Sequence, residues 1–376
     1  MTHHTRLFSR KKGRVLAAFA VASVLTLASC SSSPESETGD DQGQEETDAD
    51  DIVFIQAVRS LSNPYHANWV AGGELYADQI EVEQVVLSDD GDSQKQLSQI
   101  KSQLATSSSA GKTVVLNVDP NTSADTQAIV RAVADVDGYV LTHWNKPDDL
   151  HPWDIGDNWV AHVSFDGRVS GYEIAKLLFE EMGGEGRIVA LQGILDNVSA
   201  KERFEGLQKA LEEFPDIELL DEQTADWDRN KGFEVTQTLM SKYGDDINGV
   251  WAANDNMALG ALEALKAAGK GGDVPIVGVD AVPEALEAVE DSDNTGYLAT
   301  VSSDAFWQGG AMIALGYQAA TGEYDVGEAD EADREFYGTQ VLITKENAAD
   351  YLEPATLEDL QEDFKNPLQR STGPIQ

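Results

Sequence analysis

The sequence predicts an α/β protein: two doubly wound parallel-sheet lobes joined by a hinge that the chain crosses several times. Buried strand patterns alternate with amphipathic helix patterns from residue 52 onward, which is typical of parallel sheets with helices on both faces. The alternation runs through two successive series, each about 110 to 140 residues long, the usual size of a domain. Polar and aromatic residues gather just after the strands of both series.

The amino-terminal segment, residues 1–29, is set aside because its pattern is that of an export signal. Basic residues are spread over positions 6–14, and an apolar run follows at 15–27. This run is shorter than the about 20 apolar residues that a membrane-spanning helix needs. Ala28 and Ser29 precede Cys30, the one cysteine of the chain, and the arrangement resembles the lipobox of bacterial lipoproteins. That resemblance implies cleavage before Cys30 and a lipid on its sulfur; an ordinary signal peptide followed by an incidental cysteine stays open.

Residues 30–51 form the expected tether. They are mostly polar and acidic and lack apolar periodicity, a composition typical of a solvated, extended linker. The whole chain has 67 acidic and 26 basic residues, a formal net charge of −41. Such a balance argues against nucleic acid and against a basic patch for anionic lipid. The carboxylates are scattered, which favours a solvated surface over a metal site, and one cysteine excludes an internal disulfide framework.

In the first series, the positions of strands and helices are predicted from turn residues and from the spacing of apolar residues. Asn63 and Pro64 end the first strand, and Leu97, Ile100 and Leu104 recur at the spacing of one helix face. Strands are expected at 52–58, 82–87, 113–117 and 138–142, and helices at 65–80, 93–105 and 124–134.

The second series begins after residues 162–164. Phe204, Leu207 and Leu211 form one apolar stripe of a helix. Strands are expected at 187–193, 217–220, 249–253, 274–279 and 297–301, and helices at 171–181, 200–213, 231–241, 257–268 and 283–289.

After the second series, a helix at 306–321 and a strand at 338–343 are expected to be divided between the two lobes. The predicted N-terminal lobe is therefore 52–164 plus 304–335, and the predicted C-terminal lobe is 165–303 plus 336–370. Asp166 is expected to brace the hinge.

Ligands of open parallel sheets bind at the carboxyl ends of the strands, so two facing lobes predict a cleft between them. The strand ends carry asparagine, aspartate, one arginine and aromatic rings, at 63–66, 117–119, 143–146, 199–203, 225–228, 254–256, 280 and 302–304. Amide, carboxylate and guanidinium groups hydrogen-bond hydroxyls, and rings lie against C–H faces. The pattern predicts a ligand made of hydroxyl groups over apolar C–H faces.

Five motifs carry a family resemblance: Asn63-Pro64-Tyr65, Gln192-Gly193 with residues 199–206, residues 225–229, residues 254–260 and residues 277–280. Over roughly 52–322, the chain resembles the ribose/galactose branch of type I periplasmic binding proteins, the solute receptors of sugar ABC transporters. The resemblance implies two hinged lobes that close on a sugar.

Carried over by position, the resemblance implies a first-lobe wall and a second-lobe set of hydrogen-bonding groups, with Trp227 stacking on the ligand. Trp144 and Asn145 stand where ribose-type members have an Asp-Arg pair, which makes the cleft less polar and favours another monosaccharide or a linear polyol over ribose. The candidate ligand-binding residues are Asn63, Tyr65, His66, Asn117, Trp144, Asn145, Arg203, Trp227, Asn254, Asp280 and Ser303.

Structural roles compete at several of these positions. Asn63 could be a turn residue before Pro64, and Trp144 and Trp227 could be core rings. Asp255 is expected to cap the following helix, leaving Asn254 for the ligand. Arg59, also at a strand end, is left unassigned.

No catalytic constellation stands out: the sequence has no Gly-x-Ser-x-Gly motif, no phosphate-binding loop and no histidine–cysteine cluster. The prediction is a monomeric, lipid-anchored solute-binding protein on the outer face of the cell membrane, serving an ABC permease, without cofactor or metal. A sensory protein presenting its closed form to a membrane kinase or chemoreceptor is the alternative, and a surface hydrolase acting on glycans is a third.

Overall fold

The computed structural model describes residues 51–375. The predicted signal peptide, Cys30 and the tether up to residue 50 lie outside the described residues. Within 51–375, no helix is long and apolar enough to cross a membrane.

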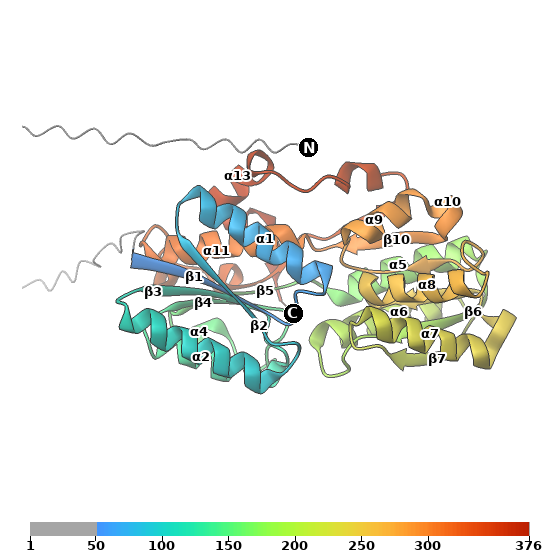
Figure 1. Cartoon of the computed structure of the whole chain (residues 1–376), viewed down its shortest axis with the longest axis horizontal. Coiled ribbons are helices and arrows are strands. Elements are labelled where there is room, and N and C mark those ends of the chain that lie inside the picture. Colours follow the sequence, from blue (N-terminus) through green and yellow to red (C-terminus); the bar gives the residue numbers. More distant parts are fainter. Residues whose placement is uncertain (1–50, 376) are drawn as a thin grey trace, which may run out of the picture. The chain divides into compact units, whose positions relative to one another are not determined.

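Two sheets form the framework (Figure 1). The first has seven strands in the order β13-β11-β5-β4-β3-β1-β2, namely β1 (Ile52–Val58), β2 (Glu83–Ser88), β3 (Thr113–Val118), β4 (Tyr139–His143), β5 (Trp159–Ser164), β11 (Glu335–Gly338) and β13 (Ser371–Pro374). The second has six in the order β12-β10-β9-β8-β6-β7, namely β6 (Glu185–Gln192), β7 (Asp216–Thr224), β8 (Gly249–Ala252), β9 (Ile276–Val277), β10 (Tyr297–Ser302) and β12 (Val341–Thr344). Within each sheet the strands run parallel except β13 and β12, which pair antiparallel at the edges. The predicted fold class is confirmed.

Helices cover the sheets. With the first sheet go α1 (Pro64–Gln79), α2 (Ser93–Ser109), α3 (Ser123–Ala134), α4 (Pro152–Ile155), α11 (Ala305–Ala320), α12 (Glu331–Arg334) and α13 (Leu357–Lys365). With the second go α5 (Gly167–Glu181), α6 (Val198–Glu213), α7 (Arg229–Tyr243), α8 (Asp255–Ala267), α9 (Pro283–Glu290) and α10 (Ser292–Thr295). Short 3₁₀ turns lie at Gly244–Asp246, Val326–Glu328, Ala348–Tyr351 and Pro367–Arg370.

Strand β1 shows why its sequence is apolar throughout. All seven of its residues are buried. Val53 and Ile55 belong to one core cluster with residues of α2 and α3, whereas Phe54 belongs to the opposite cluster with Trp69 of α1 and residues of α11. Successive side chains point to opposite faces of a strand, so a strand covered on both faces needs an unbroken apolar run.

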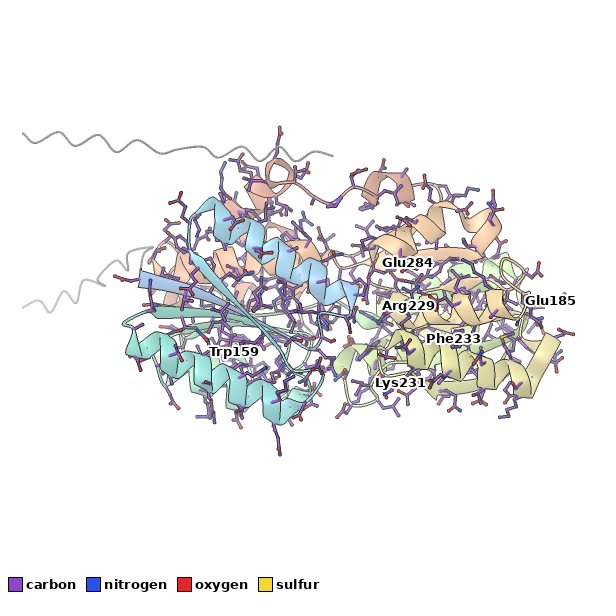
Figure 2. All side chains as sticks on the ribbon, viewed as in Figure 1. Trp159, Glu185, Arg229, Lys231, Phe233 and Glu284 are labelled. Carbon is purple, nitrogen blue, oxygen red and sulfur yellow. The ribbon has the colours of Figure 1, made fainter. Side chains whose placement is uncertain are left out.

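The second lobe also carries ion pairs between its helices. Arg229, at the start of α7, pairs with Glu284 of α9 at 2.5 Å (Figure 2). It also pairs with Glu263 of α8 at 2.5 Å. All three side chains are at least partly exposed, so the cluster orders helix ends at the surface and adds little free energy.

The chain passes between the two sheets at four places within residues 51–375: from β5 to α5, from β10 to α11, from β11 to β12, and from β12 back to α13 and β13. The first and third passages are tied together. Gln340 donates a hydrogen bond from Nε2 to the carbonyl of Asp166 (3.0 Å), and a Cβ on Gly338 would stand 2.5 Å from the ring of Phe165.

The carboxyl-terminal segment differs from the predicted lobe assignment. The predicted strand at 338–343 is two strands, β11 and β12, in different sheets. β11 pairs with β5, β13 pairs with β11, and α13 packs on α11, so much of 336–370 belongs to the first lobe. An apolar run predicts a strand but does not say which sheet the strand joins.

Candidate functional site

A cavity of about 50 Å³ lies at the carboxyl ends of the strands of both sheets. It is lined from the first lobe by Arg59, Asn63, Tyr65, His66, Asp119, Trp144 and Asn145, and from the second by Asn197, Ser199, Arg203, Trp227, Asn254 and Asp280. Every predicted site residue except Asn117 and Ser303 is among them. Trp144, Trp227, Arg203 and Asp280 thus converge on one gap.

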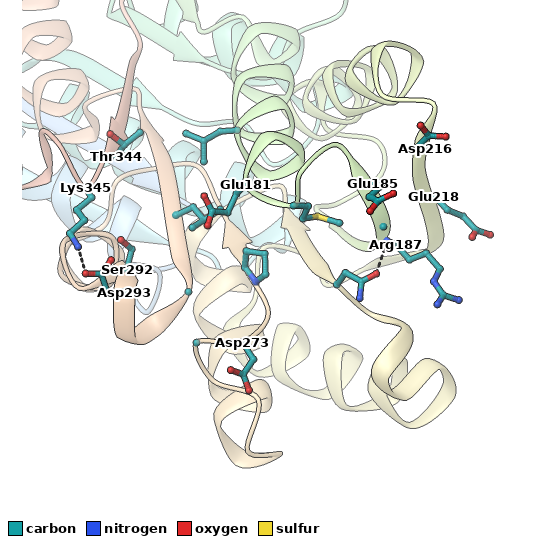
Figure 3. A pocket seen from close by; sticks show the side chains of 18 of the residues that line it. Glu181, Glu185, Arg187, Asp216, Glu218, Asp273, Ser292, Asp293, Thr344 and Lys345 are labelled. Atoms are coloured by element: carbon teal, nitrogen blue, oxygen red, sulfur yellow. Dashed lines mark hydrogen bonds and ion pairs between the residues drawn. The ribbon is translucent and has the colours of Figure 1, made fainter.

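A larger groove of about 1320 Å³ lies at the other end of the second sheet (Figure 3). It runs past the starts of β6 and β7, where Glu185 and Asp216 stand, and past Asp273 and Asp293. Its described lining has seven acidic and two basic side chains and no aromatic side chain. Because parallel sheets bind ligands at the carboxyl ends of their strands, the smaller cavity is the candidate site.

The aromatic part of the first-lobe wall satisfies its own polar atoms. Trp144 donates from Nε1 to the hydroxyl of Tyr65 (2.9 Å), and that hydroxyl donates to Oε1 of Gln308 (3.0 Å). Burial raises the pKa of Tyr65, so the phenol stays protonated. What these two side chains leave for a ligand is their ring surface rather than their hydrogen-bonding groups.

Helix α1 begins inside the site. Asn63 is its N-cap, with Oδ1 accepting from the Tyr65 amide (3.1 Å), and Pro64 occupies the first turn. This cap points the following turn, with His66, at the cavity. His66 has Nε2 3.5 Å from Oδ2 of Asp119, while its buried Nδ1 has no hydrogen-bond partner among the described residues. A buried ring nitrogen without a partner is costly, and a ligand hydroxyl at this position would satisfy it.

Arg203 of α6 lies between the aromatic side chains of the two lobes. Its guanidinium carbon is 5.2 Å from the ring centroid of Trp144 and 5.7 Å from that of Trp227. Nη1 donates to the carbonyl of Ala253 (2.7 Å) and lies 3.7 Å from Oδ1 of Asp280. Within residues 51–375 the buried Nε has no hydrogen-bond partner. The arrangement is that of a stacked cation with hydrogen-bonding capacity left over.

Asp280 faces Arg203 and accepts from Nδ2 of Asn254 (3.2 Å). Its pKa is raised to about 7, chiefly by burial and also by the charge of Asp255, against the lowering effect of Arg203. Asn254 is itself the N-cap of α8, with Oδ1 accepting from the Met257 amide (3.0 Å). The prediction that Asp255 caps this helix was therefore wrong.

Asp255 instead holds the loop that carries Asp280. Its Oδ1 accepts from the hydroxyls of Tyr297 (2.7 Å) and Thr300 (2.8 Å), and its Oδ2 accepts from the Val282 amide (3.0 Å). The backbone of the loop that carries Asp280 is strained, because Asp280 has φ 125°. A buried carboxylate whose oxygens are all used can hold such a backbone in place.

Asn117 and Ser303 lie beneath the cavity rather than on it. Asn117 is fully buried inside β3, where Nδ2 donates to the carbonyl of Gln308 (3.3 Å). Ser303 accepts from Nε2 of the same Gln308 (3.2 Å). Both support the glutamine that orients Tyr65. Asp119, two residues further along and just past the end of β3, is the residue that reaches the cavity from this strand.

Arg59, Asp119, Asn197 and Ser199 line the cavity but were not among the predicted ligand-binding residues. Arg59 and Asp119 directly follow β1 and β3, so the strand-end rule could have included them. Asn197 follows an irregular loop after β6, and no local pattern marks it. Among residues 51–375, no group of three or more His, Cys, Asp or Glu is placed to hold a metal ion.

The fold and the cavity define a two-lobed protein that binds a small polar ligand between facing α/β domains. The sequence model described as "Periplasmic binding protein domain" matches residues 54–324, and the chain belongs to this family.

Relatives and solved structures agree with this family. The chain is 31% identical over 245 residues to the ribose import binding protein RbsB of Haemophilus influenzae, covering 64% of this chain and 77% of that one. It is 39% identical over 136 residues to a xylitol-binding protein of Mycolicibacterium smegmatis, covering 36% of this chain and only 39% of that relative's length. A crystal structure of a twin-arginine translocation pathway signal protein from Burkholderia phytofirmans has a TM-score of 0.82 and 41% identity, covering 86% of this chain and 98% of that one. An ABC transporter solute-binding protein from Bacillus halodurans with bound myo-inositol has a TM-score of 0.65 and 26% identity, covering 81% and 98%.

Proposed function

We propose that this protein is the solute-binding component of an ABC importer and takes a monosaccharide or sugar alcohol between its lobes by hinge closure. The observation that carries the proposal is the cavity at the strand ends, where aromatic rings face Arg203 and Asp280. Relatives named for import of ribose and binding of xylitol, and a solved structure holding myo-inositol, support the ligand class.

The cavity supplies two kinds of contact. The rings of Tyr65, Trp144 and Trp227 take the C–H faces of a carbohydrate and exclude water. Arg203 and Asp280 take its hydroxyls, and Asp280 is a hydrogen-bond acceptor in its ionised form and a donor when protonated. Hinge closure then brings these groups together from both lobes. The ligand leaves unchanged, since the protein binds and does not catalyse.

The small volume and the aromatic rings of the first-lobe wall favour a small ligand with exposed C–H surface. A linear polyol such as xylitol meets both conditions, as does a monosaccharide other than ribose. The polar atoms of Tyr65 and Trp144 are already hydrogen-bonded to each other, so these two side chains offer a ligand their ring surfaces rather than hydrogen bonds.

We also propose export and anchoring through a lipid on Cys30, with a monomeric protein presenting its closed form to permease subunits. The support is the sequence pattern of residues 1–30. Replacement of Cys30 by alanine should release the protein from the membrane fraction into the medium, and labelling with a radioactive fatty acid should be lost. Retention of the variant on the membrane would contradict the anchor.

A thermal-shift screen with xylitol, ribitol, ribose, allose, myo-inositol and glycerol tests the ligand class. A binder raises the midpoint by mass action, by about 2.7 kcal/mol of stabilisation at 100 times Kd. Calorimetry then gives the affinity, and mass spectrometry of the recovered ligand checks that it is unaltered. Absence of any shift across the set would overturn the carbohydrate proposal.

A further inference from the structure

Asn197 occupies the N-cap of α6 but does not cap it. Asparagine is among the best N-cap residues because its side-chain oxygen accepts from the first-turn amides. Here the side chain makes no such bond, although it is only 2% exposed. Its amide group is used elsewhere.

The amide of Asn197 joins the two lobes. Its Oδ1 accepts from Nε1 of Trp227 (2.9 Å) in its own lobe and from Nη2 of Arg59 (3.4 Å) in the other. Its Nδ2 donates to the carbonyl of Asn121 (2.9 Å), again across the cleft. One buried side chain therefore contacts both walls and one of the rings of the site.

The acceptor on the first lobe is held in advance. Asn121 donates from its backbone amide to Oε1 of Gln96 (3.1 Å) and from Nδ2 to Oδ1 of Asp89 (2.8 Å). Its carbonyl also accepts from Arg59 (2.9 Å). A carbonyl fixed in this way needs no reorganisation to meet Asn197.

The helix end that Asn197 leaves uncapped is satisfied from the opposite lobe. The first-turn amide of Val198 donates to Oδ1 of Asn145 (3.2 Å), and Asn145 is fixed by donating to the carbonyl of Pro120 (2.9 Å). Helix termini have free amides that need acceptors. In the closed arrangement, Asn145 supplies one across the cleft to the helix that carries Arg203.

We infer that Asn197 is a positioning residue that, with Asn145, clasps the lobes together without ligand and sets the ring of Trp227 for binding. The three bonds across the cleft join protein atoms of the two lobes directly. The clasp raises the population of the closed form in the empty protein, and a ligand that needs that form binds more tightly in proportion. The structural part stands on these contacts alone, and only its effect on affinity rests on the proposed function.

Small-angle X-ray scattering of the ligand-free protein tests the clasp. In Asn197→Ser the shorter side chain still suits an N-cap but cannot span the cleft. The radius of gyration of the variant should exceed that of the wild type. Equal scattering curves for two folded proteins would overturn the inference.

A measurement on the wild type needs no variant. The Val198 amide should exchange with solvent at least about tenfold more slowly than freely exposed first-turn amides, because it is bonded to the other lobe in the closed form. Unprotected exchange at Val198 in the ligand-free protein would equally contradict the clasp.

Thr356→Ala is the matched control. Thr356 caps α13 by accepting from the Asp359 amide (3.4 Å), and it is not among the residues that line the cavity or form the clasp. It should lower the melting temperature without changing the scattering curve. With xylitol as the probe, Asn197→Ser should weaken apparent affinity by about tenfold, mainly through faster release, while Thr356→Ala should not. If Asn197→Ser is more open but binds with unchanged affinity, the coupling of closure to binding is refuted. If the wild type does not bind xylitol, that result counts against the proposed ligand, and the scattering measurement alone then decides whether the clasp exists.

Discussion

At the scale of single residues, the site keeps opposite charges out of water. Arg203 and Asp280 are 4% and 9% exposed and lie 3.7 Å apart. Such a pair costs desolvation energy that its mutual attraction only partly offsets. The cost is visible in the raised pKa of Asp280. Among residues 51–375 the buried Nε of Arg203 has no hydrogen-bond partner, so a ligand could accept from it.

Asp280 should make the stability of the empty protein depend on pH. Its pKa is about 7 in the folded protein against an ordinary value of 3.8. Between these values the folded chain binds more protons than the unfolded chain, so the free energy of unfolding falls as pH rises through this window and levels off above it. The contribution is present in full below pH 4 and is lost by about pH 7.

Urea unfolding of wild type and Asp280→Asn from pH 4 to pH 8 measures this effect. The free energy of unfolding of the wild type minus that of the variant should decrease with rising pH, by a few kcal/mol for a shift of about 3 units. Asp255, whose pKa burial raises to about 6, acts in the same direction in both proteins. Parallel pH profiles would show that Asp280 does not titrate in this window.

Arg203→Lys tests the stacked cation. Lysine keeps the charge but lacks the flat guanidinium that lies over Trp144 and Trp227. Affinity for the carbohydrate identified by the screen should fall about 100-fold, measured by calorimetry, because a point charge replaces a planar, multiply donating group. Arg187→Lys, at an exposed ion pair with Asp246, is the control and should bind normally. Equal affinity in both variants would show that the guanidinium of Arg203 does not contribute to ligand binding.

At the scale of elements, close helix packing places the site residues. α5 and α6 approach so closely that a Cβ on Gly171 would stand 2.0 Å from the carbonyl oxygen of Arg203. A backbone carbonyl cannot swing aside as a side-chain end can. Glycine at this position therefore determines how deeply α6, and with it Arg203, sits against the second lobe.

Gly171→Ala should displace α6 and cost stability, about 1–3 kcal/mol as overpacking usually does. Ligand affinity should fall as well, since the shifted backbone belongs to Arg203. Gly260→Ala offers a matched comparison, because its Cβ would stand 2.1 Å from the carbonyl of Arg229 in the α7–α8 pair. Chemical unfolding and calorimetry should show similar losses of stability, with the larger loss of affinity in Gly171→Ala. The reverse order of affinities would contradict this account.

At the scale of the whole molecule, the net charge of −41 makes electrostatic repulsion a main factor in stability. Like charges distributed over one folded body repel one another more than they do in the expanded unfolded chain. Surface ion pairs such as that of Lys95 with Asp90 are few compared with the carboxylates and are exposed, so they neutralise little of this repulsion.

Salt should therefore stabilise the protein. Raising NaCl from about 20 mM to about 500 mM shortens the screening length from about 20 Å to about 4 Å, and the melting temperature should rise steadily over this range. KCl serves as the control for a specific sodium effect and should act equally. A melting temperature that falls with either salt would mean that attractive pairs outweigh the repulsion.

Local pattern predicted much of the site, and the reason is geometric. Arg203, Trp227 and Asp280 come from distant parts of the chain, yet strand-end position alone placed them together, because parallel strands end at one edge of a sheet. The same rule placed Asn117 at the cavity, but Asn117 lies within β3, two residues before the lining residue Asp119, and its side chain is bonded to Gln308 in the core. It could not distinguish Asn254 from Asp255 as the cap of α8, since both types suit an N-cap.

By itself, the sequence determined the α/β class, the two series of strands and helices and the end of the sheets that carries the polar and aromatic groups. These depend on periodicity and on turn residues, which act over a few positions. Tertiary structure alone decided that 335–338 and 341–344 join different sheets and that Asp255 supports the Asp280 loop. It also decided that the side chain of Asn197 forms hydrogen bonds across the cleft rather than capping its own helix. Those outcomes depend on partners far away in the chain, which no local pattern encodes.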